Sequence, residues 1–130
     1  MEQLLCYFPN QSDPMLAEVR RAALPLKIRL RVASSGQTGQ KLGFLLGRPD
    51  FEEQAGDAPA VPESVLILDG FTGPRMDAFL RALAKARTPR STLKAAVTAH
   101  NVDWTLFELW QELKQEREAL EKGEAPVHQK

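Results

Sequence analysis

Residues 65–86, "VLILDGFTGPRMDAFLRALAKA", contain a strand and a helix joined by a tight turn. The run at 65–68 is apolar on both faces, which is typical of a strand in the middle of a sheet. After the turn "DGFTGP", the apolar side chains recur at helical spacing and are Met76, Phe79, Leu80 and Leu83. A second strand, "TLKAAVT" (92–98), follows and alternates polar and small apolar residues. Residues 65–98 therefore predict a β-α-β unit.

The amino-terminal part of the chain predicts the same order of elements. "LLCYF" (4–8) is an apolar strand, and "MLAEVRRAAL" (15–24) is a helix that Asp13 and Pro14 can start. "KIRLRVA" (27–33) alternates basic and apolar residues, which indicates a strand with one solvated face at a sheet edge. Pro14 and Pro74 occupy matching places, so residues 4–33 and 65–98 form two similar units.

The remaining segments predict a short helix, a loop and a long final helix. "QKLGFLLG" (40–47) is a helix that Gly47 ends, and residues 48–64 have three prolines and no periodicity. A helix at 104–121 carries an apolar stripe of Leu106, Leu109, Trp110, Leu113 and Leu120. Gly123 ends this helix, and residues 123–130 form a flexible tail. We expect a single domain over residues 1–122.

Two β-α-β units in tandem predict an α+β fold with a ferredoxin-like split β-α-β duplication and a four-stranded sheet. The strands at 4–8 and 65–68 are central in this arrangement, because they are apolar on both faces, and the alternating strands lie outside. The alternative is an α/β doubly wound parallel sheet, with residues 40–47 as a further crossover helix. The solvated face of residues 27–33 and the long loop favour the split arrangement.

Composition argues against several classes of protein. The chain has 17 basic and 17 acidic side chains, so its formal charge is zero and no overall field attracts nucleic acid or a membrane. The strand at 65–68 lacks the stacking aromatics of RNA-recognition sheets. Cys6 is the single cysteine, which excludes an internal disulfide and suits a reducing compartment. We expect a cytoplasmic protein with no metal, no cofactor, no nucleic-acid partner and no membrane contact.

The ends of the strands at 65–68 and 92–98 offer a candidate ligand site. Parallel strands would bring Asp69, Thr98, His100 and Asn101 to one rim beside two helix amino termini, where a small anion can bind, with Lys94 as a less favoured member. The structural alternative is that Thr98 and Asn101 satisfy the turn, Asp103 caps the last helix, and His100 and Lys94 are solvated. We favour this alternative and assign no catalytic residue.

Residues 65–118 resemble a small bacterial family described as a domain of unknown function. The resemblance rests on "LDGFT", on the helix with Met76, Phe79 and Leu80, and on "LKAAVTAHNVDWTLFELWQELKQERE". The matching positions in the last segment are Leu93, Lys94, Ala95, Thr98, Asn101, Trp104, Thr105, Leu109 and Glu112. His100 falls where the family has no fixed residue, so the resemblance implies no role for it.

The family is sometimes described as an amidotransferase, and the residues argue against that activity. Glutamine amidotransferases need a cysteine nucleophile at the amino terminus or at a sharp elbow near a histidine. Cys6 is in the middle of an apolar strand instead. We expect a non-enzymatic ligand-binding or protein-interaction domain, with a homodimer through a sheet edge or the last helix. The alternative is a small enzyme or a phosphate-ligand site at the rim, so the sequence leaves enzymatic activity open.

Overall fold

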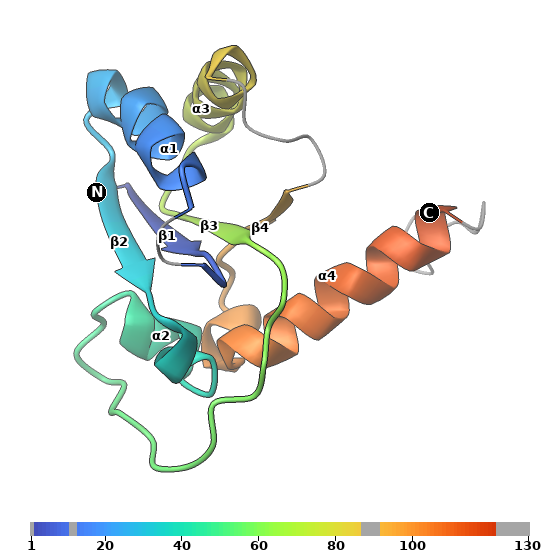
Figure 1. Cartoon of the computed structure of the whole chain (residues 1–130). Helices are drawn as coiled ribbons and strands as arrows, with labels where there is room; N and C mark the ends of the chain where they lie inside the picture. Colours follow the sequence, from blue (N-terminus) through green and yellow to red (C-terminus); the bar gives the residue numbers. More distant parts are fainter. Residues whose placement is uncertain (1, 11–12, 87–91, 122–130) are drawn as a thin grey trace.

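The computed structural model describes residues 2–10, 13–86 and 92–121 (Figure 1). The strands are β1 (Gln3–Tyr7), β2 (Arg29–Ala33), β3 (Val65–Asp69) and β4 (Leu93–Ala96). The α-helices are α1 (Met15–Ala23), α2 (Leu42–Leu45), α3 (Gly73–Lys85) and α4 (Leu106–Glu121). Three short 3₁₀ helices are η1 (Leu24–Leu26), η2 (Ser35–Gln37) and η3 (Asn101–Asp103). Gly123 and the predicted tail at 123–130 lie outside the described residues.

The four strands form one mixed sheet in the order β2-β1-β3-β4. β1 pairs with β2 in parallel, β3 pairs with β4 in parallel, and β1 and β3 are antiparallel, with Leu5 opposite Ile67. The fold is therefore α+β, with the first strand of each β-α-β unit in the centre and the second strand at an edge. These positions agree with the apolar character of β1 and β3 and with the polar residues of β2.

The finer topology differs from the prediction. A split arrangement would place a strand of the other unit between β1 and β2, but these two strands are direct neighbours, so the ferredoxin-like order is not confirmed. The doubly wound parallel alternative is wrong, because the central pair β1 and β3 is antiparallel. Apolar character indicated which strands are central, but it does not specify which strand lies beside which.

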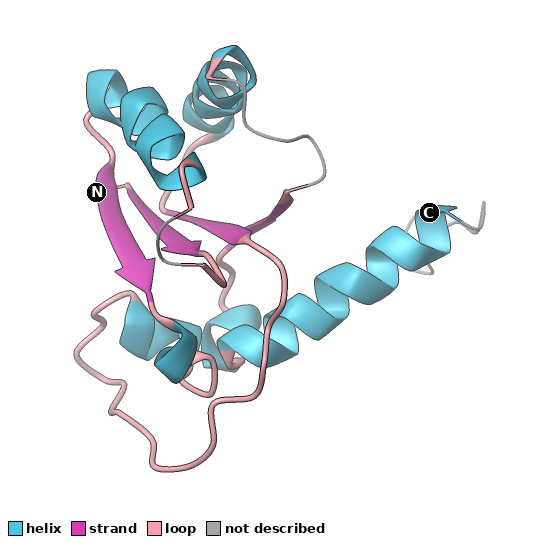
Figure 2. Cartoon of the chain, viewed as in Figure 1, coloured by secondary structure: helices cyan, strands magenta, loops and turns pink. Residues whose placement is uncertain are grey.

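Helices and loops cover both faces of the sheet (Figure 2). One face packs against α1 and α3, and its core contains Leu4, Cys6, Val19, Leu66, Phe79 and Leu83. The other face packs against α2, the segment before β3 and the start of α4, and its core contains Leu5, Tyr7, Leu42, Ile67, Leu106 and Leu109. The Tyr7 hydroxyl donates a hydrogen bond of 2.8 Å to the Val61 carbonyl, which fastens the long loop to this second core.

The edge strand β2 differs from the predicted pattern in two ways. It begins at Arg29, because Lys27 adopts a left-handed conformation (φ 58°) at the end of η1. Its basic face is partly covered: Arg31 is half-buried and donates from Nε to Gln3 Oε1 at 2.7 Å. Val32, predicted to face the core, is 46% exposed, because an edge strand has no neighbour on one side.

Among the described residues, no helix has both the length and the apolar character that a membrane-spanning segment needs. The longest helix, α4, carries several charged side chains along its length.

Cys6 should be unreactive in the native protein. Its side chain is fully buried in β1, and burial raises the pKa of the thiol to about 12. Iodoacetamide reacts with the thiolate, so at mildly alkaline pH we expect native Cys6 to be alkylated far more slowly than Cys6 in guanidinium-unfolded protein. Mass spectrometry of timed samples measures both rates. Equal rates would show that β1 is not buried in solution.

Candidate functional site

The predicted rim residues Thr98 and Asn101 are used by the turn that follows β4. Asn101 is 8% exposed, and its Oδ1 accepts a hydrogen bond of 2.8 Å from the Thr98 amide. Its Nδ2 donates to the Ala96 carbonyl at 3.0 Å. The Thr98 hydroxyl accepts from the amides of His100 and Asn101, at 3.2 and 3.0 Å. These bonds satisfy backbone groups that leave the sheet, which is the structural role expected for the two side chains.

Asp69, at the end of β3, forms its hydrogen bonds with residues on the β1 side of β3 and not with the turn that follows β4. Its Oδ1 accepts from Arg48 Nη2 and its Oδ2 from Gln3 Nε2, both at 3.0 Å. Gln3 also donates to the Leu46 carbonyl at 3.1 Å, so the cluster ties the end of α2 to the sheet. Within the described residues, no hydrogen bond or ion pair connects Asp69 with the Thr98 turn, so the structure does not join them into one polar site.

His100 and Lys94 contact different residues and do not form a shared site. His100 is exposed, and its ring packs edge-on against the Trp104 ring at 5.3 Å between centroids. Lys94 pairs with Leu66 in the sheet and is half-buried, and its Nζ donates to the Thr92 carbonyl at 3.1 Å. Burial lowers the pKa of the Lys94 ammonium. Lys94 is therefore less solvated than the sequence predicted.

The capping role predicted for Asp103 is wrong, because Thr105 caps α4. The Thr105 hydroxyl accepts from the Glu108 amide at 3.1 Å, and Glu108 Oε1 accepts from the Thr105 amide at 2.8 Å. This reciprocal pair is a capping box, so α4 begins at Leu106 instead of residue 104. The sequence "TLFE" at 105–108 carries the Thr-x-x-Glu signature of this capping box.

An open cavity of about 510 Å³ lies beside the loop after α2. Its lining residues are Lys41, Pro49, Asp50, Phe51, Glu52, Glu53, Gln54 and Asp103, and none of the five predicted rim residues is among them. In the part of the chain that the structure describes, no group of three or more His, Cys, Asp or Glu residues is placed to hold a metal ion. The acidic lining therefore does not form a metal site.

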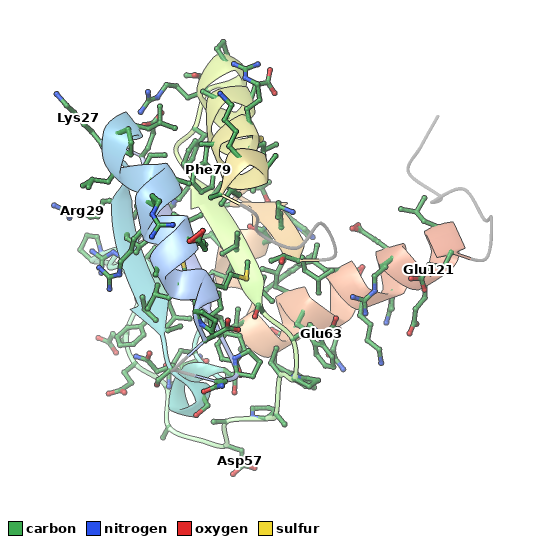
Figure 3. The ribbon with its side chains drawn as sticks, turned by 45° about the horizontal axis from the view of Figure 1, so that its top comes forward. Lys27, Arg29, Asp57, Glu63, Phe79 and Glu121 are labelled. Atoms are coloured by element: carbon green, nitrogen blue, oxygen red, sulfur yellow. The ribbon has the colours of Figure 1, made fainter. Side chains whose placement is uncertain are left out.

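A surface that sequence reasoning did not define lies where α4 passes the β4 edge. The first turns of α4 are buried under the sheet through Leu106 and Leu109, and Leu113 packs against the same core. The helix then continues past β4, so that Glu121 lies far from the sheet (Figures 1 and 3). Leu120, in this outer part, is 60% exposed. We call residues 113–121 the outer half of α4.

A single carboxylate holds α4 in this direction. Glu63, just before β3, accepts a hydrogen bond of 3.1 Å from Trp110 Nε1 and a bidentate pair of 2.6 and 2.9 Å from Arg117. The Arg117 guanidinium lowers the pKa of Glu63. Lys114 lies over the Trp110 ring, with Nζ 5.4 Å from the centroid. The loop before β3 is thereby attached to the helix at two places, one turn and three turns after its start.

Comparison with known families agrees with the resemblance seen in the sequence. Residues 64–120 match the family model of a domain of unknown function (DUF3783). The matched region contains β3, α3, β4 and nearly all of α4, whereas β1, α1, β2 and α2 precede it. No curated protein and no solved structure matches the chain. The family description assigns no activity.

Three single substitutions test the roles assigned to Asn101 in the turn, to Thr105 as the cap of α4, and to the exposed Asp103. Asn101→Ala removes two side-chain hydrogen bonds, one from the Thr98 amide and one to the Ala96 carbonyl, and should cost about 1–3 kcal/mol of unfolding free energy. Thr105→Ala should cost about 0.5–2 kcal/mol as a lost helix cap. Asp103→Ala, on an exposed side chain without a capping bond, should stay within about 0.5 kcal/mol. Urea denaturation measures all three, and a larger loss for Asp103→Ala than for Thr105→Ala would contradict the assigned cap.

Glu63→Gln should lower stability in a pH-dependent way. The native pKa of Glu63 is depressed, so its carboxylate stabilises the fold above the ordinary glutamate pKa of 4.5 and this contribution is lost as pH falls through the native pKa. Near neutral pH the variant should lose about 1 kcal/mol, since the pair is partly solvated. Thermal melts of both proteins across the acidic range should therefore converge. A difference that stays constant into strong acid would contradict the ion pair.

Proposed function

We propose that this protein is a non-enzymatic protein-interaction domain that forms a homodimer through β4 and the outer half of α4. The observation that carries the proposal is the projection of α4 beyond an open sheet edge. Within one copy, the same helix covers the sheet with its apolar stripe. A second copy that extended the sheet at β4 would bring its own strands under the outer half of α4.

The β4 edge has outward backbone groups for pairing, and the Ala96 carbonyl, which accepts from Asn101 Nδ2, keeps a second lone pair. The Val97 amide donates to the Leu68 carbonyl at 2.8 Å, so Val97 and Ala95 direct their amides toward β3. Because amides alternate along a strand, Lys94 and Ala96 direct theirs outward. Antiparallel pairing about Ala95 would place Ala96 opposite Lys94 of the second copy. The small side chains of Ala95 and Ala96 allow the two edges to approach closely, and the two lysines are not directly opposite each other.

The outer half of α4 supplies the apolar contact that a short strand pair needs. Leu106, Leu113 and Leu120 are spaced seven residues apart, so they lie along nearly the same side of the helix. Leu106 is fully buried against the sheet, whereas Leu120, in the part of α4 that extends beyond β4, is 60% exposed. Contact with the sheet of a second copy would bury Leu120. An isolated pairing of two four-residue strands would be too weak without such packing.

The predicted rim has less support as an enzyme or phosphate-ligand site. The polar groups of Thr98, Asn101 and Asp69 are engaged in hydrogen bonds and an ion pair, as described above. A ligand would have to compete with these bonds. The buried single cysteine and the zero formal charge are consistent with the expected cytoplasmic protein, and the family resemblance with a bacterial source.

Two substitutions of opposite charge at Ala96 test the proposed dimer. The Ala96 side chain is exposed in one copy, so neither change should disturb the monomer fold. Ala96→Lys would face Lys94 of the second copy and should shift the protein to monomer, whereas Ala96→Glu should keep or strengthen the dimer. Leu120→Gln should weaken it. Sedimentation velocity over a range of micromolar concentrations measures the association, with circular dichroism as the control for folding.

The proposal is wrong if the unmodified protein remains monomeric throughout this range. It is also wrong in its pairing register if Ala96→Lys and Ala96→Glu have equal effects, since only contact with Lys94 of the second copy distinguishes the two charges. Dissociation by Ala96→Lys together with retention by Ala96→Glu supports both the edge and the register.

A further inference from the structure

We infer that the opposite sheet edge, β2, binds an extended acidic segment of a partner protein by strand addition. Strand addition joins a peptide to an open edge through main-chain hydrogen bonds, while pockets beside the edge select alternate side chains. This surface is distinct from the proposed dimer contact, because β2 and β4 are at the two ends of the sheet. Three observations support it: the free edge, an apolar hollow and a local excess of positive charge.

The main-chain groups of the middle of β2 face outward. The Arg29 amide donates to the Glu2 carbonyl at 3.3 Å, so Arg29 and Arg31 direct their amides toward β1. The alternation along a strand then directs the amide and carbonyl groups of Leu30 and Val32 away from the sheet. An incoming strand can pair with these two residues without breaking any backbone bond among the described residues.

An apolar hollow adjoins this edge on the side of α1. Its volume is about 230 Å³, and it is lined by Arg20, Ala23, Leu24, Ile28 and Leu30. The large apolar side chains exposed on the described part of the chain are Leu24, Val32, Leu80 and Leu120. Leu24, at 78%, and Val32, at 46%, are thus both found beside the β2 edge. A groove between a helix end and an edge strand can receive an aliphatic side chain of an added strand.

The charged groups beside the β2 edge are mainly cationic, with Arg20 lining the hollow and Arg29 on the opposite face of the strand. Arg20, Lys27 and Arg29 are exposed, and Figure 3 shows Lys27 and Arg29 extending outward on this side of the molecule. The nearby carboxylates already have partners, since Glu2 pairs with Arg75 at 2.6 Å and Glu18 pairs with Arg21. The edge is therefore locally positive, although the whole chain has no net formal charge.

This charge pattern favours an acidic partner over a second copy of the chain. Antiparallel pairing of two β2 strands about Arg31 would place Arg31 opposite Arg31, and pairing about Leu30 would place Arg29 opposite Arg31. Like charges directly opposite each other destabilise a strand pair. Nucleic acid is also acidic, but residues 27–33 contain no aromatic side chain on which a base could stack. An acidic polypeptide strand can form main-chain hydrogen bonds with the β2 edge and place carboxylates beside its basic side chains.

The pleat of the added strand specifies its side-chain pattern. Leu30 and Val32 lie on the face of the hollow, whereas Arg29 and Arg31 lie on the other face. Alternate residues of the ligand would then face the hollow and the arginines in turn. We expect the preferred segment to alternate aliphatic and acidic residues over about six positions, the usual length of a strand.

Fluorescence anisotropy with designed peptides tests the inference. The probe is a fluorescein-labelled hexapeptide of alternating glutamate and valine. One control peptide has the same composition in two blocks, with three glutamates followed by three valines, and a second has lysine in place of glutamate. The dissociation constant of the alternating acidic peptide should be at least about tenfold lower than that of either control peptide, which corresponds to about 1.4 kcal/mol of binding free energy. If the blocked peptide bound with equal affinity, the interaction would depend on net charge alone and not on strand alternation, and the inference would be wrong.

Two variants locate the binding on β2. Val32→Pro removes an outward amide that does not donate to any described residue, and Arg29→Glu reverses an exposed charge. Each should weaken binding of the alternating peptide by about tenfold or more, while Ala96→Lys at the other edge should leave it unchanged. Circular dichroism checks that both variants are folded. If Val32→Pro is unfolded, the peptide affinity of Arg29→Glu alone tests the inference. Unchanged binding by Arg29→Glu, or tighter binding of a thymidine oligonucleotide than of the peptide, would refute the inference.

Discussion

The structure depends on the complete burial of the two central strands. Leu4, Leu5, Leu66 and Ile67 are all at most 1% exposed, and neighbouring residues along each strand face opposite sides of the sheet. A sheet of this kind needs a covering layer on both faces. The two β-α-β units supply only one such layer, α1 and α3, on one face. The segment between β2 and β3 and the last helix have to supply the other, which accounts for the 3₁₀ turns, α2 and the attached loop.

Because different segments cover the two faces of the sheet, the sequence could predict some parts of the fold better than others. Periodicity identified every strand and α-helix of the described chain, and the two-sided apolar runs identified the central strands. It did not specify the neighbour of β1, because an apolar strand such as "LLCY" packs equally well beside β2 or β4. The predicted start of α4 is two residues too early, because Asp103 and Thr105 are both suitable capping residues and only the reciprocal bonds with Glu108 select Thr105.

The candidate sites were less predictable, because their polar groups have distant partners. Thr98 and Asn101 bond within their own turn, and local reasoning described their role correctly. Asp69 bonds to Gln3 and Arg48, which are far away in the sequence, so its role depends on the assembled sheet. The same holds for Glu63, whose partners Trp110 and Arg117 lie on α4. The projection of that helix beyond β4 follows from strand order and could not be read from a stripe of leucines.

The presence of two open edges of different character has a consequence for valency. A dimer joined at β4 would have an eight-stranded sheet, with four strands from each copy and one β2 edge at each end. With neighbouring strands about 4.8 Å apart, these two edges would be about 34 Å from each other. A partner with two acidic segments joined by a linker of suitable length could engage both edges at once. Its second segment would then bind at a high effective concentration, so two weak strand additions would give tight binding by avidity.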